Sequence, residues 1–141
     1  MRNFFQFIAL LFCGILLASV SFSCGSREAF QVELETGGNG EKALLYVNEK
    51  SFCAAEDIDA LELTVTIEAE GGSGAFTIEN RYTGKLCSYI DIDENSPTGE
   101  NNVLLCSLKK ESEYVMRLTG ENSDRLRAEI TSRDKRIRAQ I

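Results

Sequence analysis

The chain has 141 residues, with 22 acidic and 15 basic side chains, one proline, and neither histidine nor tryptophan. The acidic excess disfavours nucleic acid as a partner, because phosphate backbones repel it. Without histidine, the commonest general base and the usual partner of a cysteine nucleophile are missing. No phosphate-binding loop or dinucleotide fingerprint occurs either, so we expect no enzyme and no cofactor.

The N-terminus has the pattern of an export signal. Arg2 supplies one positive charge, and an almost uninterrupted apolar run follows it from Phe4 to Val20. A cationic start, an apolar stretch and small residues before a cleavage site are typical of a secretory signal peptide. The run is marginal for a membrane-spanning helix, which needs about 20 apolar residues. The sequence therefore predicts a signal peptide over residues 1–23.

Two cleavages are compatible with the residues that follow. Ser21 and Ser23 are small residues of the kind that ordinary signal peptidase accepts. The stretch VSFSC (20–24) also resembles a bacterial lipobox, although that family usually has leucine where this chain has Ser21. The resemblance implies that Cys24 is acylated and anchors the protein in a membrane, with residues 24–28 as a short tether. The alternative is a secreted protein in which Cys24 forms a disulfide.

Beyond residue 28, apolar and polar residues alternate in short segments. In LELTVTIEAE (61–70), every second residue from Leu61 onward is apolar. A period of two with β-branched residues predicts a half-buried strand of an antiparallel sheet. Eight such segments separated by turn signals predict an all-β, antiparallel sandwich of seven to eight strands over residues 29–132. The predicted strands cover residues 29–36, 43–47, 61–70, 75–80, 85–92, 102–108, 114–119 and 124–131.

Neighbouring segments are expected to pair as hairpins. Residues 29–36 and 43–47 flank the turn GGNG, and residues 85–92 and 102–108 flank an acidic loop. The stretch 48–59 is the least regular and leaves room for a helical turn at AAED.

Two stretches between Leu61 and Thr131 resemble a known family. TIEAEGGSGAFTIEN is similar to the strand–GG(S/T)G–strand signature of bacterial immunoglobulin-like or PKD-like repeats, and SEYVMRLTGENSDRLRAEIT is similar to their closing hairpin. Tyr114 lies where a tyrosine-corner residue would be. The proline common before the aromatic at Phe76 is missing, as is a central tryptophan. The resemblance implies an immunoglobulin-like sandwich used for cell-surface binding, adhesion or spacing, and fold alone does not fix which.

Four cysteines remain after the signal peptide, and export to an oxidising environment favours their pairing. In a hairpin of the two segments around the acidic loop, Cys87 lies opposite Cys106 with the Cβ atoms within bridging range. We therefore predict a Cys87–Cys106 disulfide, with Cys53–Cys106 as the alternative. Cys53 is left over if Cys24 is acylated, and it pairs with Cys24 if not.

The acidic loop opens with an Asp-x-Asp-x-Asn pattern. Asp91, Asp93, Asn95 and Glu100 offer oxygen ligands of the kind that Ca²⁺ prefers. An EF-hand is excluded, because Ser96 stands where that motif needs glycine. The loop is therefore a weak calcium candidate at most, and no metal is expected; the simpler interpretation is an exposed loop kept soluble by its charges.

Charge is uneven along the chain. Residues 24–108 contain 16 acidic and 5 basic side chains, whereas residues 109–141 contain 6 acidic and 9 basic ones. We expect residues 133–141 to form a basic tail. The last predicted strand (124–131) is expected at a sheet edge, where its outward charges would prevent strand pairing and keep the protein a monomer.

Together, these features predict a non-catalytic, exported lipoprotein of the bacterial cell envelope. Its membrane anchor would be Cys24, and its immunoglobulin-like domain would bind or space a protein or glycan at the cell surface. The alternative is a soluble, secreted effector or inhibitor that is stapled by two disulfides.

Overall fold

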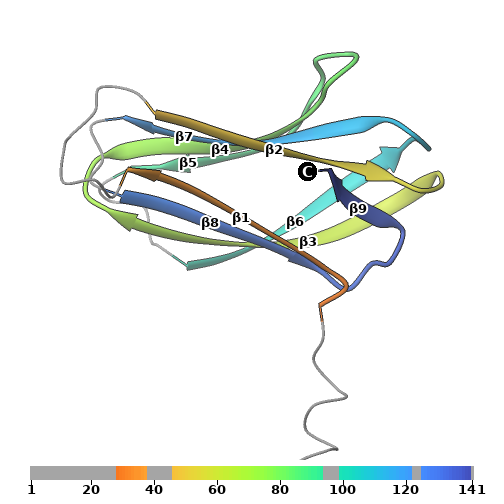
Figure 1. The fold of residues 1–141 in the computed structure, drawn as a ribbon, viewed down its shortest axis with the longest axis horizontal. Coiled ribbons are helices and arrows are strands. Elements are labelled where there is room, and N and C mark those ends of the chain that lie inside the picture. The colour runs from red at the N-terminus through yellow and green to blue at the C-terminus, as the bar shows by residue number, and fades with distance from the viewer. Residues whose placement is uncertain (1–27, 38–45, 94–98, 122–124, 141) are drawn as a thin grey trace, which may run out of the picture.

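The computed structural model describes residues 28–37, 46–93, 99–121 and 125–140. Within them the chain forms nine strands in two antiparallel sheets that pack face to face (Figure 1). The predicted all-β sandwich is confirmed. This part of the chain has no helix long and apolar enough to cross a membrane. The four-stranded sheet has the order β1 (Phe30–Gly37), β8 (Arg125–Ser132), β3 (Ile58–Glu70), β6 (Gly99–Leu108); the five-stranded sheet has the order β5 (Leu86–Ile92), β4 (Ser73–Asn80), β7 (Glu113–Glu121), β2 (Tyr46–Ala54), β9 (Ile137–Gln140).

Side-chain alternation decides which face of each strand is buried. On β3, Leu61, Leu63 and Val65 are buried between the sheets, whereas Glu62 and Glu68 are exposed. The same alternation on β1 and β8 was predicted from their sequences and is confirmed. Because the inward residues of both sheets are almost all apolar, burial of the core drives the two layers together.

An aromatic group closes one end of this core. The ring of Phe52 lies edge-on to Phe30 at a centroid distance of 5.8 Å and stacks on Tyr114 at 5.3 Å. The Tyr114 hydroxyl accepts a hydrogen bond from the backbone N–H of Lys109 at 3.1 Å, which ties the start of β7 to the end of β6. This bond to the backbone a few residues upstream is the one that a tyrosine corner makes, as the sequence predicted.

The three predicted hairpins are wrong. β1 and β2 lie in different sheets, as do β5 and β6, and β7 and β8. Residues 38–45, 94–98 and 122–124, which separate the strands of these three pairs in the sequence, lie outside the described ranges. Alternation specifies which face of a strand is buried, but it does not specify which strand lies beside it. The sequence therefore predicted strands more reliably than their partners.

The last predicted strand is not at a sheet edge. β8 lies between β1 and β3, and its outward residues form ion pairs with both neighbours. Because β8 is not an edge strand, its charges cannot keep the protein a monomer by protecting a sheet edge.

Two segments without a clear pattern are also strands. Residues 48–54 belong to β2, so the helical turn considered at AAED is absent and Phe52 is buried in the core. Residues 137–140 form β9, which pairs with β2, and Ile137 is only 4% exposed. The sandwich thus extends beyond the boundary drawn at residue 132. A four-residue strand with one inward apolar residue is too short for its alternation to stand out from the surrounding charges.

The GGSG stretch is a turn followed by the start of a strand. Gly71 and Gly72 have φ angles of 67° and 72°, in the left-handed region that glycine tolerates. β4 begins directly after them, and Gly74 already pairs with β5 and β7. A Cβ at Gly74 would collide with the carbonyl oxygen of Thr119 on the neighbouring strand β7 and approach Leu126 Cδ1 of the other sheet to 2.6 Å, so the close approach of the β7 backbone requires glycine here.

Candidate functional site

The cysteines of the described residues are free thiols. Cys106 lies opposite Ala60 on β3, so the register that placed it opposite Cys87 is wrong. Cys53 and Cys106 point outward from different sheets, since their neighbours Phe52 and Leu105 are buried. The alternative Cys53–Cys106 pairing therefore also lacks its geometry. Cys24 lies outside the described residues.

The partly buried thiols are not activated. Burial raises the pKa of Cys53, and the nearby Glu113 carboxylate adds to this effect. Burial also raises the pKa of Cys87. Reactive cysteines and thiolate metal ligands need a lowered pKa. These two residues therefore do not suit nucleophilic or metal chemistry.

The calcium candidates are not brought together. Asp91 lies opposite Ala75 on the five-stranded sheet, whereas Glu100 lies opposite Thr66 on the four-stranded sheet. Both point outward, away from opposite layers of the sandwich, and Asn95 lies outside the described residues. Where the chain is described, no group of three or more histidine, cysteine, aspartate or glutamate residues could hold a metal ion.

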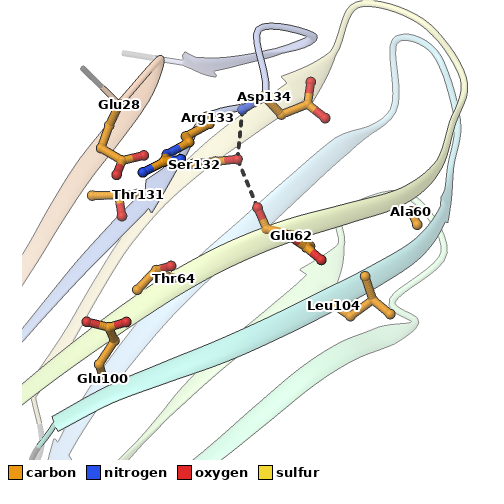
Figure 2. A pocket seen from close by; sticks show the side chains of 10 residues that line it. All are labelled: Glu28, Ala60, Glu62, Thr64, Glu100, Leu104, Thr131, Ser132, Arg133 and Asp134. Atoms are coloured by element: carbon orange, nitrogen blue, oxygen red, sulfur yellow. Dashed lines mark hydrogen bonds between the residues drawn. The ribbon is translucent and has the colours of Figure 1, made fainter. Parts of the chain in front are cut away.

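A hollow of about 640 Å³ opens on the outer face of the four-stranded sheet (Figure 2). Its floor is made by side chains that alternation turns outward from β3, β6 and β8, and one wall is the turn that follows β8. We call it the acidic hollow. Its lining consists of Glu28, Ala60, Glu62, Thr64, Glu100, Leu104, Thr131, Ser132, Arg133 and Asp134.

Strand register positions the polar groups of the floor. Glu62 lies opposite Leu104, and Thr64 lies opposite Thr131 on the other side of β3. Hydroxyl and carboxylate groups thus flank one exposed aliphatic side chain. This mixture can hydrogen-bond a polar ligand and also contact its apolar part.

Ser132 fixes the wall of the acidic hollow. Its hydroxyl donates a hydrogen bond to the carbonyl oxygen of Glu62 at 2.9 Å and accepts one from the backbone N–H of Asp134 at 3.1 Å (Figure 2). The turn after β8 is thereby tied to β3. Ser132 could not be singled out from the sequence, because its two partners lie on different segments.

Four of the five charged side chains that line the acidic hollow are negative, and at least two of the four form no ion pair among the described residues. Arg136 binds Asp134, with 2.7 Å between Nη2 and Oδ2, and this guanidinium lowers the pKa of the carboxyl. Arg133 is the one basic residue of the lining, and Figure 2 shows its side chain directed toward Glu28. Glu62 and Glu100 have no ion pair among the described residues. The electrostatic potential in the acidic hollow should therefore favour a cationic group.

A second hollow, of about 570 Å³, lies where β1 faces β2. Two side chains of β2 reach across it to the backbone of β1. Lys50 Nζ donates to the carbonyl oxygen of Glu33 at 2.8 Å, and Asn48 Nδ2 donates to that of Glu35 at 2.9 Å. These bonds link the two sheets, so we assign this region to the structure of the sandwich.

Comparisons with known proteins find only distant structural likenesses. No protein-family model matches the chain, and a search of curated proteins finds no match either. The Yersinia pseudotuberculosis-derived mitogen is similar with a TM-score of 0.42 and 9% identity, over 79% of this chain and 95% of that protein. CsCBM6-3 from Clostridium stercorarium, solved with cellobiose, has a TM-score of 0.36 and 14% identity, over 79% and 99% of the two chains.

A carbohydrate-binding module from Cellvibrio mixtus lichenase 5A, solved with cellotriose, has a TM-score of 0.39 and 10% identity, over 82% of this chain and 92% of that one. All three TM-scores are below 0.5, so these likenesses carry no conclusion about this chain. They do not bear on what this chain binds.

Proposed function

We propose that this chain is a non-catalytic binding domain of the bacterial cell envelope, held at a membrane by an acylated Cys24. Its binding surface is the acidic hollow, which accepts a cationic group of a protein or glycan partner. The observation that carries this proposal is the presence of two carboxylates, Glu62 and Glu100, that form no ion pair with any described residue and lie in an open hollow with the hydroxyls of Thr64 and Thr131.

The composition and the thiols support binding in preference to catalysis. The chain lacks histidine, and the two partly buried cysteines have raised pKa values. The polar groups of the acidic hollow lie on the outer face of a sheet, which holds them in a fixed pattern without enclosing a substrate. A rigid sheet with spaced hydrogen-bonding groups suits recognition.

The position of the acidic hollow is compatible with a membrane-proximal partner. Glu28 lines it and is also the first described residue. Cys24 and Glu28 are separated by only four residue steps, which span at most roughly 15 Å when fully extended. An acylated Cys24 would thus keep the acidic hollow close to the bilayer surface.

The anchor is tested by metabolic labelling with an alkynyl fatty acid in a bacterial host. We expect label on the wild-type chain and none on the Cys24→Ser variant. A wild-type chain that is exported without label would contradict the anchor and support the soluble, secreted alternative.

The acidic hollow is tested by calorimetric titration with two cationic probes, tetralysine and an oligomer of glucosamine. We expect at least one probe to bind, and the double variant Glu62→Gln/Glu100→Gln to weaken it about tenfold or more, since each charged contact contributes roughly 1 kcal/mol or more. Glu70→Gln is the matched control, because Glu70 is exposed on the same strand but outside the acidic hollow. Equal loss in the control variant would contradict a role for this hollow.

A further inference from the structure

The four edges of the two sheets differ in how they are protected. The edge of β1 is covered by Lys50 and Asn48, which bind its carbonyl oxygens. β9 has only four residues and carries Arg138. The pairing of β5 with β4 shifts register between Ile78 and Glu79. Short strands, bulges and charged side chains are devices that keep sheet edges from pairing with other chains.

β6 has none of these devices along most of its length. It is ten residues long, and its pairing with β3 runs without a shift from Ala60 opposite Cys106 to Ile67 opposite Gly99. Its sequence GENNVLLCSL contains no lysine, arginine or proline, and Glu100 is its single charge. Within the described residues, β3 is its one strand neighbour.

A regular edge of this kind offers backbone hydrogen bonds to an added strand. In an antiparallel pair, every second residue directs its N–H and C=O away from the neighbour. On β6 these groups point away from β3. Peptides that add a strand to such an edge obtain affinity from the main chain and specificity from alternate side chains.

The acidic hollow adjoins this edge and indicates the charge of the added strand. Glu100 and Leu104 lie on β6 itself and line the hollow, and Glu62 lies one strand further in, opposite Leu104. Alternate side chains of a strand beside β6 would therefore point over these carboxylates. Because Glu62 and Glu100 lack ion pairs among the described residues, lysine or arginine at those positions would be favoured. A second copy of this chain would instead bring the same unpaired Glu100 to the junction.

We infer that β6 binds an extended, basic segment of a partner protein as an additional strand, with its alternate basic side chains over the acidic hollow. The inference rests on the proposed function, of which it specifies the partner and the mode of binding. It requires both the charge of the acidic hollow and the backbone edge of β6, beside which no second strand lies among the described residues. These two requirements can be tested separately.

The experiment uses the full chain in neutral detergent under reducing conditions, with four fluorescent octapeptides. In the first peptide, lysine alternates with valine or threonine, and in the second, glutamate replaces lysine. The other two keep the lysines but are N-methylated at alternate residues, one at the odd-numbered and the other at the even-numbered positions; they are the two N-methylated phases. We expect the first to bind, the second not to bind, and at least one N-methylated phase to bind about tenfold more weakly or worse, since each lost backbone bond costs roughly 1 kcal/mol.

Hydrogen exchange followed by NMR gives a direct measurement at the edge. On addition of the lysine peptide, alternate amides between Gly99 and Cys106 should change from fast to slow exchange. Glu62→Gln/Glu100→Gln should weaken binding, and binding should also weaken between low and high salt.

Three outcomes would overturn the inference. Tight binding of both N-methylated phases with unchanged β6 amides would refute the added strand while leaving the acidic hollow as a binding site. Equal binding of the glutamate peptide would refute the charge argument and the proposed function together. Slow exchange of the same amides without peptide, together with dimerisation that depends on concentration, would identify a second copy as the occupant.

Discussion

At both ends of the outer face of the four-stranded sheet, alternation turns glutamates outward. The two ends differ in whether these glutamates form ion pairs among the described residues. At the ion-paired end, Arg127 binds Glu33 through two contacts of 2.8 and 3.0 Å and also lies 3.5 Å from Glu68, while Arg125 binds Glu35 at 2.9 Å. At the other end is the acidic hollow, where Glu62 and Glu100 form no ion pair within the described part of the chain. Arg125 and Arg127 of β8 thus pair with outward glutamates of the neighbouring strands, whereas Glu62 and Glu100 form no ion pair among the described residues.

This difference follows from the central position of β8. Its outward residues Arg125, Arg127 and Glu129 lie between β1 and β3, so an arginine there can contact carboxylates on both sides. One step further along, Thr131 takes the same outward position and lies opposite Thr64. Thr131 has a short hydroxyl side chain where Arg125 and Arg127 have long cationic ones. It therefore leaves space on the sheet and does not neutralise nearby carboxylates.

The largest effect on stability is expected from a substitution in the core beneath this outer face. Leu63 is 2% exposed and lies beneath the outer face, between Glu62 and Thr64. Leu63→Ala should reduce the free energy of unfolding by about 2–5 kcal/mol, because it leaves a cavity in the core. Leu104→Ala is the control, since Leu104 is 58% exposed on the neighbouring strand and should change stability by less than about 0.5 kcal/mol. Urea denaturation of both variants measures the difference; similar losses would contradict the assigned faces.

A smaller effect is expected at the wall of the acidic hollow. Ser132→Ala removes the hydrogen bonds to the Glu62 carbonyl oxygen and from the Asp134 N–H. Because Ser132 is buried, we expect a loss of about 1–3 kcal/mol in stability. Binding of the lysine octapeptide should weaken as well, since the turn after β8 is no longer tied to β3. Ser88→Ala, on the edge strand β5 of the other sheet, should leave that binding unchanged.

Removing an arginine should make the ion-paired end resemble the acidic hollow, because its glutamates then lose their cation. Arg127→Met removes the cation that faces Glu33, Glu68 and Glu129. We expect a small fall in stability, as exposed ion pairs contribute little. The more informative readout is a new, weak site for tetralysine, measured by calorimetry in the variant that also carries Glu62→Gln/Glu100→Gln. Absence of any new binding would show that unpaired glutamates on this sheet do not suffice.

The sequence specified which face of each strand is buried, but it did not specify which strands lie side by side. The acidic hollow depends on which strands lie side by side. The outward positions of Glu62 and Thr64 followed from the pattern of β3, and Leu104 could be assigned to an outward face in the same way. What the pattern did not contain was the pairing of β3 with β6, because strands with similar alternation can pair in several orders. The acidic hollow exists only once Glu62, Leu104 and Thr131 are brought side by side, so it could not be predicted without the topology.

The cysteine prediction failed for the same reason. Cys87 and Cys106 were placed opposite each other by assuming that consecutive strands are neighbours. Tyr114, in contrast, was predicted correctly, because its partner is the backbone of Lys109 five residues upstream. Local hydrogen bonds are accessible from sequence, whereas contacts between distant strands require the fold.

The smallest expected effect is the acid dependence of the ion-paired end. Arg127 lowers the pKa of Glu33 below its ordinary value of 4.5 in the folded protein, mainly through the hydrogen-bonded ion pair. The unfolded chain therefore binds this proton more readily, and stability that is present above pH 4.5 is lost as the pH falls through the lowered value. Arg127→Met should flatten this part of the stability profile. Because both groups are exposed, the change should be a slight shift in the urea midpoint between about pH 5 and pH 3, reduced further by salt. An identical acid profile in wild type and variant would mean that the Glu33–Arg127 pair is not maintained in solution. The two ends of the sheet would then differ only in the shape of their surface.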